Sequence, residues 1–439
     1  MMSGPLEPLY TAAEMKAAEE GQDVEQLMER AGRAVADVIL TRFSAGRTFS
    51  AVCGGGANGG DGRIAAELLR SSGWEERPVG EADVVIDALF GTGFRDAPRE
   101  EAAKQIQAMN RSDASVVSVD IPSGVDASTG EVPGEAVTAA LTVTFHGRKV
   151  GHDVAPGRFH RGELVVSDIG LEPAETEHAL VTTEILDAVP RRRPGDTKYS
   201  AGSVLVVGGS PGLTGAVCLT AEAAFRADAG YVAVAAPEES LPVIETRLLE
   251  AVKRPLDDVW DAVERAGALA LGPGLGRERG DLVRRLLEET DVPAVVDADG
   301  LYGLEPFERE AATVLTPHSG ELGRLLGEEA AWVDAHRLEA LRWAVEQYRC
   351  IVLLKGEGTL VGAPGAGVFV CGGFPSLATA GTGDVLTGVV AAFLAKGMDA
   401  RLATAAASTA HTQAAVTAPY RSGLVASDLL GALPRVLDA

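Results

Sequence analysis

Oxygen-bearing side chains recur in the first third of the chain, directly after apolar or glycine-rich stretches. The run CGGGANGGDG places Asn58 and Asp61 among six glycines. Asp87 and Asp120 each end an apolar stretch that is typical of a strand, and Ser123 follows the second. Ligands of open parallel sheets bind at the carboxyl ends of the strands, so we expect these side chains to lie together. The oxygen ligands of Asn58, Asp87, Asp120 and Ser123 together favour an alkali or alkaline-earth cation.

The glycines of that run suit an approaching ligand as well as a turn. Without Cβ atoms, backbone amides come close to an anion or to a metal-bound ligand. The run lacks the Lys-Ser/Thr ending of a phosphate loop and the clean spacing of the dinucleotide fingerprint. Taken alone it fits a plain tight turn equally well, and a single strand-ending aspartate is often only a helix cap. The recurrence of oxygen-bearing groups at three strand ends favours a site.

A second set of motifs, nearer the carboxyl end, is suited to phosphate chemistry. LLKGEGTLV puts Lys355 and a glycine turn after a strand, which suits nucleotide phosphates. SLATAGTGDVLTG gives Gly381, Gly383 and Asp384 immediately before a predicted helix, where amides bind phosphate and the carboxylate faces a substrate hydroxyl. VLTPHSGE ends a strand at His318; a lone histidine is more often structural, but its place beside a proline turn favours function. A capped glycine turn explains each motif alone as well, and only together do they indicate a site.

Alternating strand and helix patterns must position these groups. Apolar residues at helical spacing over 27–39 precede short apolar strands in the first part of the chain: FSAVC, DVVIDALF, SVVSVDI, ALTVTF and ELVVSDIG. After an acid-, Thr- and Pro-rich stretch at 170–193, a second series begins with SVLVVGG and ends in an alanine-rich helical region. In the first series, continuous apolar strands separated by helices predict a parallel sheet covered on both faces. We therefore predict two tandem α/β domains, a Rossmann-like one at 1–175 and a second at 190–439.

Composition limits the partners and the compartment. The chain has 439 residues and a net charge of -24, which repels nucleic acid phosphates and anionic membranes but allows an anionic small ligand at a local site. We therefore expect no nucleic acid partner and no membrane partner. The four cysteines are scattered without a zinc or redox pair, and neither a signal peptide nor an apolar run of about 20 residues is visible. The predicted location is the cytoplasm.

The first 170 residues resemble the epimerase domain of NAD(P)H-hydrate repair proteins through five motifs in order: LMERAG, GGGANGGDG, DALFGTG, VDIPSG and TVTFHGRKVG. The resemblance implies that a potassium ion is held by Asn58, Asp87 and Ser123. It implies that the hydrated nicotinamide nucleotide contacts Asp120 and two segments: Ala57, Asn58, Gly59, Gly60 and Asp61, then Gly91, Thr92, Gly93, Phe94, Arg95, Asp96 and Ala97. Asp120 is then the acid/base that inverts the hydroxylated ring carbon. On this account the glycine run is bare so that a cation and a dinucleotide can share it.

Two features of the first domain depart from the family pattern. Ala57 stands where the family usually has the first of two asparagines. Only residues 63–86 separate the glycine run from Asp87, and this stretch is too short and too charged for the further strand and helix that are usual there. The shortening leaves open a non-enzymatic role, in which the first domain senses nucleotides or forms oligomers beside an active second domain.

The second domain carries AGTGD, which is similar to the anion-hole motif of ribokinase-like small-molecule kinases, where the Asp is the base for phosphoryl transfer. A fuller set resembles the ADP-dependent NAD(P)H-hydrate dehydratase of that superfamily: GGSPGLTGAV, GPGLG, DADGL, TPHSGE, KGEGT and AGTGDVLTG. The resemblance covers 190–439 and implies a ribokinase-like fold with Asp384 as the catalytic base. It implies contacts to the hydrated nucleotide from Ala216, Gly274, His318 and Asp384, and to ADP from Lys355, Gly356, Glu357, Gly358, Thr359 and Gly383. Gly300 replaces a usual alanine and Ser319 a usual proline, and both are mild changes.

The two resemblances together predict a bifunctional repair enzyme. It interconverts the R and S epimers of hydrated NADH and NADPH, and it dehydrates the S form at the expense of ADP. Phosphoryl transfer from ADP to the ring hydroxyl would make a good leaving group, and loss of phosphate would regenerate the dihydropyridine. Potassium is expected in the first domain, magnesium with unassigned ligands in the second, and a homo-oligomer as the assembly. The alternative is a ribokinase-like small-molecule kinase, on a hydroxymethyl pyrimidine or a sugar, with an inactive or sensory first domain.

Overall fold

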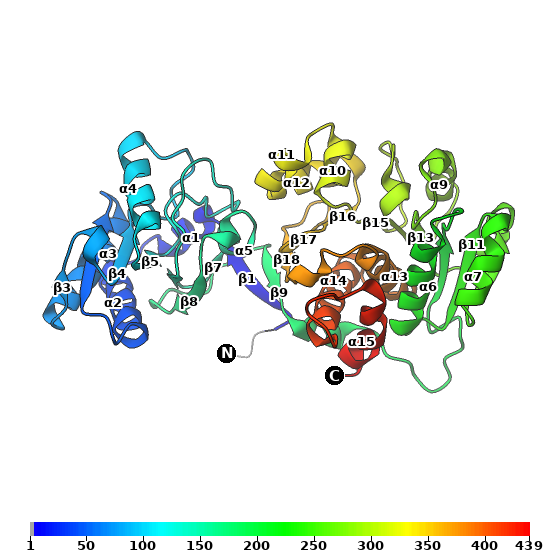
Figure 1. Cartoon of the computed structure of the whole chain (residues 1–439), viewed down its shortest axis with the longest axis horizontal. Helices are drawn as coiled ribbons and strands as arrows, with labels where there is room; N and C mark the ends of the chain where they lie inside the picture. Colours follow the sequence, from blue (N-terminus) through cyan, green and yellow to red (C-terminus); the bar gives the residue numbers. More distant parts are fainter. Residues whose placement is uncertain (1–3) are drawn as a thin grey trace. The chain divides into compact units, whose positions relative to one another are not determined.

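The computed structural model describes residues 4–439 and divides them into two compact units. The N-terminal unit consists of Pro8–His178 and the short segment Asp334–Leu338. The C-terminal unit holds the other described residues, mainly Ala179–Val333 and Glu339–Ala439. Each unit contains a sheet with helices packed on it (Figure 1). The predicted α/β class is therefore confirmed in both units.

The main sheet of the N-terminal unit is parallel throughout. Its strand order is β3-β2-β4-β5-β6-β8. The strands are β2 (Thr48–Cys53), β3 (Glu75–Glu76), β4 (Val84–Ala88), β5 (Ser115–Val119), β6 (Leu141–Phe145) and β8 (Glu163–Ser167). A separate parallel pair joins the end of β1 (Leu6–Tyr10) to β7 (Arg148–Lys149). The register sets Asp87 of β4 opposite Ser118 of β5.

Strand alternation divides the core of this sheet between two faces. Odd positions of β5 and even positions of β4 point toward α2 (Val24–Arg42) and α3 (Ala57–Ser71), whose apolar residues form one cluster with them. Val85 and Val116 point the other way, toward Ile106 and Met109 of α4 (Glu100–Arg111). Two further helices of the unit are α1 (Ala12–Glu19) and α5 (Val150–Asp153). Burial on both faces explains why these strands are mainly apolar along their whole length.

The segment between α3 and β4 is short in the structure as well. It holds the two-residue strand β3 and the single 3-10 turn η1 (Val79–Glu81), and it contains no α-helix. Val79 and Ala82 pack against the same cluster as α4, so this turn covers part of the sheet face. At this place the sheet face is therefore covered by a few side chains instead of by a helix.

The sheet of the C-terminal unit is mixed. From one edge its order is β12-β11-β10-β13-β14-β15-β16-β17-β18-β9. The strands are β9 (Ala179–Val181), β10 (Ser203–Val207), β11 (Tyr231–Ala236), β12 (Val252–Pro255), β13 (Ala268–Leu271), β14 (Ala294–Val296), β15 (Thr313–Leu315), β16 (Ile351–Leu354), β17 (Thr359–Gly362) and β18 (Phe369–Cys371). Pairing is parallel from β12 to β16 and antiparallel for β16–β17 and β17–β18. Strand β17 runs antiparallel to β16 because the four-residue turn between them, 355–358, is too short for the crossover that parallel neighbours need.

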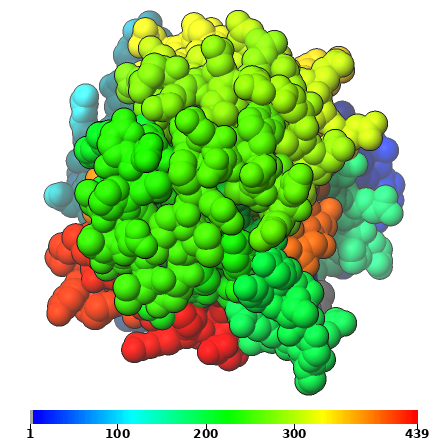
Figure 2. All heavy atoms as spheres, turned by 90° about the vertical axis from the view of Figure 1, so that its right-hand side faces the viewer, coloured from blue at the N-terminus to red at the C-terminus, as the bar shows by residue number. Residues whose placement is uncertain are grey.

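Four helices form one large core cluster with alternate residues of the sheet, such as Val204 and Ala270. They are α6 (Thr214–Arg226), α13 (Thr382–Ala395), α14 (Ala400–Thr417) and α15 (Ala426–Asp438). Val385 to Leu394 are buried without a break, as in a helix enclosed on all sides. The remaining helices are α7 (Leu241–Arg247), α8 (Val259–Val263), α9 (Gly280–Glu288), α10 (Ser319–Leu326), α11 (Ala330–Ala335) and α12 (Arg337–Tyr348). Side chains of the 200–300 region fill most of the face seen in Figure 2. Among residues 4–439, no helix is long and apolar enough to cross a lipid bilayer.

Candidate active sites

The glycine run of the N-terminal unit forms a helix start instead of an open loop. Helix α3 begins at Ala57, after Gly56 in an extended conformation, so the expectation of a bare loop at Ala57–Asp61 is wrong. A Cβ atom on Gly59 would meet the carbonyl of Gly54, and one on Gly62 would meet Ala88. Close packing of α3 on the strand ends therefore requires these two glycines.

This packing predicts that Gly59→Ala destabilises the N-terminal unit, although alanine is ordinarily the better helix former by about 1 kcal/mol. Overpacking against the Gly54 carbonyl should cost about 1–3 kcal/mol in the free energy of unfolding. Urea denaturation measures this change in the free energy of unfolding. Gly80→Ala is the matched control, because nothing lies within 4 Å of its Cβ position. Equal stability of the two variants would contradict the packing argument.

Asp87, Ser123 and Asn58 come together behind the glycine run. The carboxylate of Asp87 is fully buried and accepts bonds from Ser123 Oγ (2.6 Å), Ser118 Oγ (2.7 Å) and the Ser123 amide (2.9 Å). Burial raises the pKa of Asp87, and the Ser123 bonds oppose that rise. Asn58 Nδ2 donates to the Phe90 carbonyl at 2.7 Å. The oxygen-rich set of Asp87, Ser123, Asn58 and the Phe90 carbonyl is chemically suited to a hard monovalent or divalent cation.

Asp120 is paired with a buried lysine. Asp120 follows β5 in a left-handed conformation with φ of 65°, which short polar side chains tolerate. Lys149, only 1% exposed, donates from Nζ to Asp120 Oδ1 (2.5 Å), Thr144 Oγ1 (2.8 Å) and the Phe145 carbonyl (2.9 Å). Thr144 Oγ1 also donates to Asp120 Oδ1 at 2.9 Å. Burial alone would raise the pKa of Asp120, but Lys149 holds it below its ordinary value, so the carboxylate is ionised.

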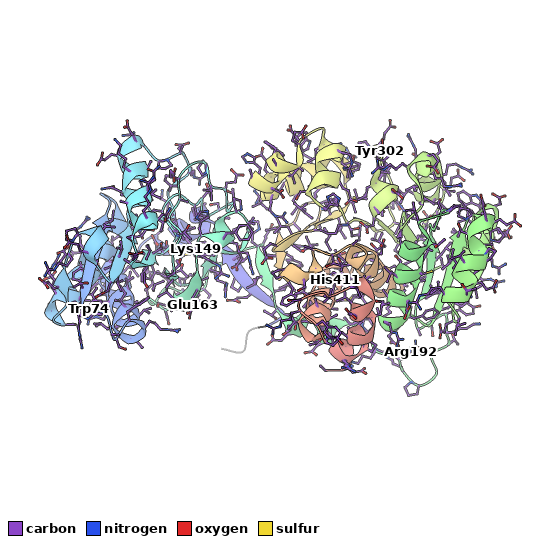
Figure 3. All side chains as sticks on the ribbon, in the orientation of Figure 1. Trp74, Lys149, Glu163, Arg192, Tyr302 and His411 are labelled. Carbon is purple, nitrogen blue, oxygen red and sulfur yellow. The ribbon has the colours of Figure 1, made fainter. Side chains whose placement is uncertain are left out.

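His152 fixes the backbone of Asp120. Its Nδ1 accepts a bond from the Lys149 amide at 2.9 Å, so Nε2 carries the proton and donates to the Asp120 carbonyl at 2.8 Å. Burial lowers the pKa of His152 to about 4, which keeps the ring neutral and this tautomer in place. Figure 3 labels Lys149 within this unit. The charge and the orientation of the Asp120 carboxylate are therefore set by surrounding groups.

A cavity of about 800 Å³ opens in front of these groups. It is lined by predicted substrate-binding residues: Ala57, Asn58, Gly59, Asp61, Gly91, Thr92, Gly93, Phe94, Arg95, Asp96 and Asp120. Gly60 and Ala97 are not part of the lining; a Cβ atom on Gly60 would meet Met28 of α2, and Ala97 Cβ lies 3.4 Å from the Cβ position of Gly134. Glu19 at the end of α1 also lines the cavity. Such a volume accommodates a drug-sized ligand.

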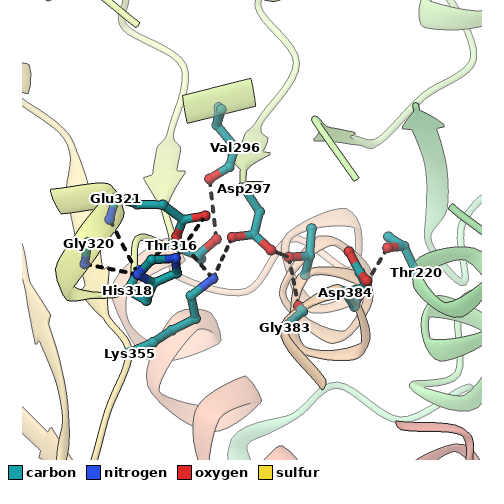
Figure 4. Close-up of polar contacts among 11 residues, drawn as sticks. Thr220, Val296, Asp297, Thr316, His318, Gly320, Glu321, Lys355, Gly383 and Asp384 are labelled. Carbon is teal, nitrogen blue, oxygen red and sulfur yellow. Dashed lines mark hydrogen bonds and ion pairs between the residues drawn. The ribbon is translucent and has the colours of Figure 1, made fainter. Parts of the chain in front are cut away.

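The C-terminal unit gathers its charged groups at the carboxyl ends of the parallel strands (Figure 4). Asp297, which directly follows β14 and is 1% exposed, accepts a bond from Lys355 Nζ at 2.7 Å and one from Thr387 Oγ1 at 2.8 Å. Lys355 follows β16, and its Nζ lies 3.6 Å from Glu321 Oε2. Burial acts to lower the pKa of Lys355, but Asp297 and Glu321 together raise it. Lys355 is therefore charged, and it is held against the first turn of α13.

Asp384 lies inside the first turn of α13. The helix begins at Thr382, so the expectation that Gly383 and Asp384 precede it is wrong, and the helix starts three residues earlier than expected. Gly381 takes the left-handed N-cap conformation with φ of 88°, which brings the chain sharply into the helix. A Cβ atom on Gly383 would lie 3.4 Å from Lys355 Nζ, so glycine leaves the space between the helix amides and the lysine open to an anion.

The Asp384 carboxyl is poised to titrate near neutrality. Burial and then the charge of Asp297 raise its pKa to about 7, while Lys355 opposes the rise. Its backbone carbonyl accepts a bond from Thr220 Oγ1 of α6 at 3.0 Å. A carboxyl with such a pKa can act as a proton acceptor at physiological pH.

The other predicted residues of this unit lie on neighbouring strand ends. Gly274 follows β13 with φ of 59°, and its Cβ position is 3.3 Å from Ala216 Cβ on α6. His318 caps α10: its Nδ1 accepts from the amides of Gly320 (2.9 Å) and Glu321 (3.3 Å). Its side chain is 56% exposed. The prediction of a substrate contact through His318 thus involves Nε2, since Nδ1 is occupied.

In the predicted nucleotide segment Lys355–Thr359, residues 355–358 form the turn between β16 and β17, and Thr359 begins β17. Gly356 and Gly358 have φ values of 148° and 69°, which other residues rarely adopt. Thr359 Oγ1 donates to the Gly356 carbonyl at 3.3 Å. The structure thus brings Lys355, Gly383 and Asp384 together, with the glycine turn attached to Lys355.

The ion pair predicts a large effect of Lys355→Met on stability. Removing the lysine leaves Asp297 buried with one fewer partner, which should cost about 3–5 kcal/mol in the free energy of unfolding. The double variant Lys355→Met/Asp297→Asn removes the uncompensated charge, and we expect it to recover much of that loss. Chemical denaturation of both variants measures this coupling. A double variant less stable than Lys355→Met would show that the pair is not coupled.

Among the residues of these sites that were not predicted from the sequence are Lys149, Asp297 and Glu19. Asp297 had a visible signal, because VVDADGL ends a strand in an acid as the predicted Asp87 and Asp120 do. Lys149 lies 29 positions from its partner Asp120 and in a two-residue strand, so no local pattern indicates the contact. Glu19 ends a helix among exposed acids, and the sequence around it reads as an ordinary solvated face.

Comparisons with known families cover both units. A family model described as NAD(P)H-hydrate dehydratase matches residues 204–435. A model described as YjeF-related protein N-terminus matches residues 24–80 and 74–151. The second match is split at the shortened segment between α3 and β4.

Similar proteins extend the match to nearly the whole chain. The chain is 36% identical to the Bifunctional NAD(P)H-hydrate repair enzyme Nnr of Moorella thermoacetica, over 98% of this chain and 96% of the relative. It is 33% identical to the protein of the same name from Escherichia coli K12, over 95% of this chain and 90% of the relative. The crystal structure of ADP/ATP-dependent NAD(P)H-hydrate dehydratase from Bacillus subtilis with ATP and Mg²⁺ matches with a TM-score of 0.54 and 28% identity, covering 58% of this chain and 96% of that one. A ribokinase-like superfamily protein from Enterococcus faecalis, 23% identical with a TM-score of 0.54, shares the fold of 61% of this chain. The chain therefore belongs to the family of bifunctional NAD(P)H-hydrate repair enzymes.

Proposed function

We propose that this chain interconverts the R and S epimers of hydrated NADH and NADPH in its N-terminal unit and dehydrates the S epimer, at the expense of ADP, in its C-terminal unit. The observation that carries the proposal is the presence of two strand-end sites, each with a lysine–aspartate ion pair in which one partner is buried, and each with a carboxyl placed for proton transfer. The names of the relatives do not favour the alternative of a small-molecule kinase with an inactive or sensory first domain.

In the N-terminal unit, Asp120 is the proposed acid/base at the hydroxylated ring carbon. The proposed substrate contacts are Ala57–Asp61 and Gly91–Ala97, most of which line the cavity. Asn58, Asp87 and Ser123 are the proposed ligands of potassium, and the Phe90 carbonyl is near enough to join them. A bound cation would supply positive charge beside the dinucleotide. Lys149 keeps Asp120 ionised, and His152 keeps its backbone in place.

In the C-terminal unit, Asp384 is the proposed base that accepts the proton of the ring hydroxyl as ADP transfers a phosphoryl group to it. Gly383 in the first turn of α13 and Lys355–Thr359 are proposed to bind the phosphates of ADP. Ala216, Gly274 and His318 are proposed to contact the hydrated nucleotide. Magnesium, whose ligands stay unassigned, would neutralise the phosphate charge.

The partners proposed from this chemistry are hydrated NADH and NADPH together with ADP. The proposed compartment is the cytoplasm, where these nucleotides are abundant and free thiols persist; the four cysteines are unpaired. The negative net charge argues against nucleic acid and anionic membranes as partners, and a homo-oligomer is the proposed assembly.

Separated epimers test the proposal directly. The full chain is incubated with the R epimer of hydrated NADH, first without ADP and then with it, and the products are separated by chromatography. We expect S epimer without ADP, faster than in buffer, and NADH only after ADP is added. Phosphorylation of an unrelated alcohol by ATP, with no conversion of the hydrate, would instead support the small-molecule kinase. Transfer of ¹⁸O from the hydrate hydroxyl into phosphate tests the phosphorylated intermediate.

A further inference from the structure

Asp61 is a buried carboxyl group without a partner. It lies in the first turns of α3, is 8% exposed, and lines the cavity of the N-terminal unit. Within residues 4–439, no group donates a hydrogen bond to its carboxyl oxygens and no cation pairs with them. Buried polar groups are nearly always satisfied, so an open carboxyl facing a cavity indicates a ligand-directed role.

The charges around Asp61 make its ionisation unfavourable. Burial, and then the negative charges of Asp120 after β5 and Glu19 at the end of α1, raise its pKa to about 8. The nearby cation, Lys149 of β7, is already engaged by Asp120. Helix α2 packs on α3 through Gly32 and Met28, which carry no charge. The loop after β4 that lines the cavity carries one basic residue, Arg95, and one acidic residue, Asp96. Asp61 therefore holds its proton at neutral pH.

Asp120 on the same cavity is in the opposite state. Its Oδ1 is occupied by Lys149 and Thr144, and its side chain is 13% exposed. Two carboxyl groups that line one cavity therefore differ in protonation state: Asp120 is charged and Asp61 is neutral. Environments that separate two carboxyl groups in this way mark an acid and a base.

We propose that Asp61 is the proton donor of the epimerisation and Asp120 its proton acceptor, acting on opposite faces of the hydroxylated ring carbon. The inference rests on the proposed epimerase function and assigns its second catalytic group. Water adds to the enamine of a dihydropyridine so that the hydroxyl sits on the carbon bonded to the ring nitrogen. Asp61 protonates that hydroxyl, the C–O bond breaks as the nitrogen lone pair forms C=N⁺, and water leaves. A solvent water then adds to the other face and gives its proton to Asp120.

This step makes a labelling prediction. Protons and electrons balance, since one proton is given by Asp61 and one is taken by Asp120, and bulk water restores both groups. The oxygen of the product therefore comes from solvent. We expect S epimer formed from R epimer by the full chain in H₂¹⁸O, without ADP, to carry ¹⁸O. Retention of the original oxygen would overturn the proposal, because it requires ring opening at the C–N bond instead.

Substitution of Asp61 tests the donor. Asp61→Asn keeps the shape and removes the proton, and we expect epimerisation to fall by about 10²-fold or more. Asp126→Asn is the matched control, a buried aspartate of the same unit outside the cavity, and should keep the wild-type rate. Wild-type epimerisation should also fall above about pH 8, and Glu19→Gln should move that fall to lower pH by removing a negative neighbour. An Asp61→Asn rate within threefold of wild type would overturn the assignment.

A spectroscopic readout separates this role from a structural one. The infrared carbonyl band of a protonated carboxyl should be present at pH 7 in the wild-type protein and reduced in Asp61→Asn. An unchanged band would overturn the protonated state. Failure of the proposed function is distinguishable, because then the wild-type chain itself would not exceed the uncatalysed epimerisation rate.

Discussion

Asp384→Asn is expected to abolish ADP-dependent recovery of NADH while leaving epimerisation intact. Asparagine cannot accept the hydroxyl proton, so the rate of dehydration of the S epimer should fall by about 10²–10⁴-fold. The wild-type rate should rise with pH through about 7, because burial and Asp297 raise the pKa of Asp384 to that value and only the ionised form is a base. Absorbance recovery at the reduced-nicotinamide band, with pure S epimer and ADP, measures both effects.

The control for this variant is within the same chain. R-to-S conversion without ADP depends on the other unit and should keep its wild-type rate. Dehydration by Asp384→Asn at the wild-type rate, or a wild-type profile flat between pH 5 and 9, would show that Asp384 is not the base.

Asp120→Asn is expected to remove epimerisation and spare dehydration of the S epimer. The loss should again be about 10²–10⁴-fold, because the amide neither accepts nor gives the proton. Asparagine tolerates the left-handed backbone at this position, so the loop conformation should persist. Chromatographic separation of the R and S epimers over time measures the rate.

The variant also leaves Lys149 buried without its carboxylate, which should cost about 3–5 kcal/mol in the free energy of unfolding. The double variant Asp120→Asn/Lys149→Met removes both charges, and we expect it to regain stability but not epimerisation. Recovery of epimerisation in the double variant would show that Asp120 only balances the lysine and has no catalytic role.

Local patterns in the sequence were enough to predict the sheet of the N-terminal unit and the strand ends of both sites. Asp120 and Lys355 directly follow buried, mainly apolar strands, and Asp87 lies near the end of another. Asp384 lies in the first turn of a buried helix. Both patterns are set by burial on both sheet faces. Parallel strands bring their carboxyl ends to one edge of a sheet, so within each unit the site residues meet in space even though they are far apart in sequence.

Helix starts and long-range ion pairs were not predictable in the same way. The glycines at 59 and 62 read as a loop, yet close packing against Gly54 and Ala88 makes them the start of α3. The contact of Lys149 with Asp120 depends on how β7 is placed, which no local periodicity records. Tertiary packing, which overrides propensity at such positions, explains both differences.

The central claim is that both units of this chain are active in one repair sequence. The most direct measurement is absorbance recovery at the reduced-nicotinamide band, starting from a mixed-epimer hydrate of NADH with ADP and the full-length protein. We expect complete recovery, beyond the share of the S epimer and faster than spontaneous epimerisation allows. Recovery that halts at that share would contradict an active N-terminal unit, and no recovery with ADP would contradict the dehydratase.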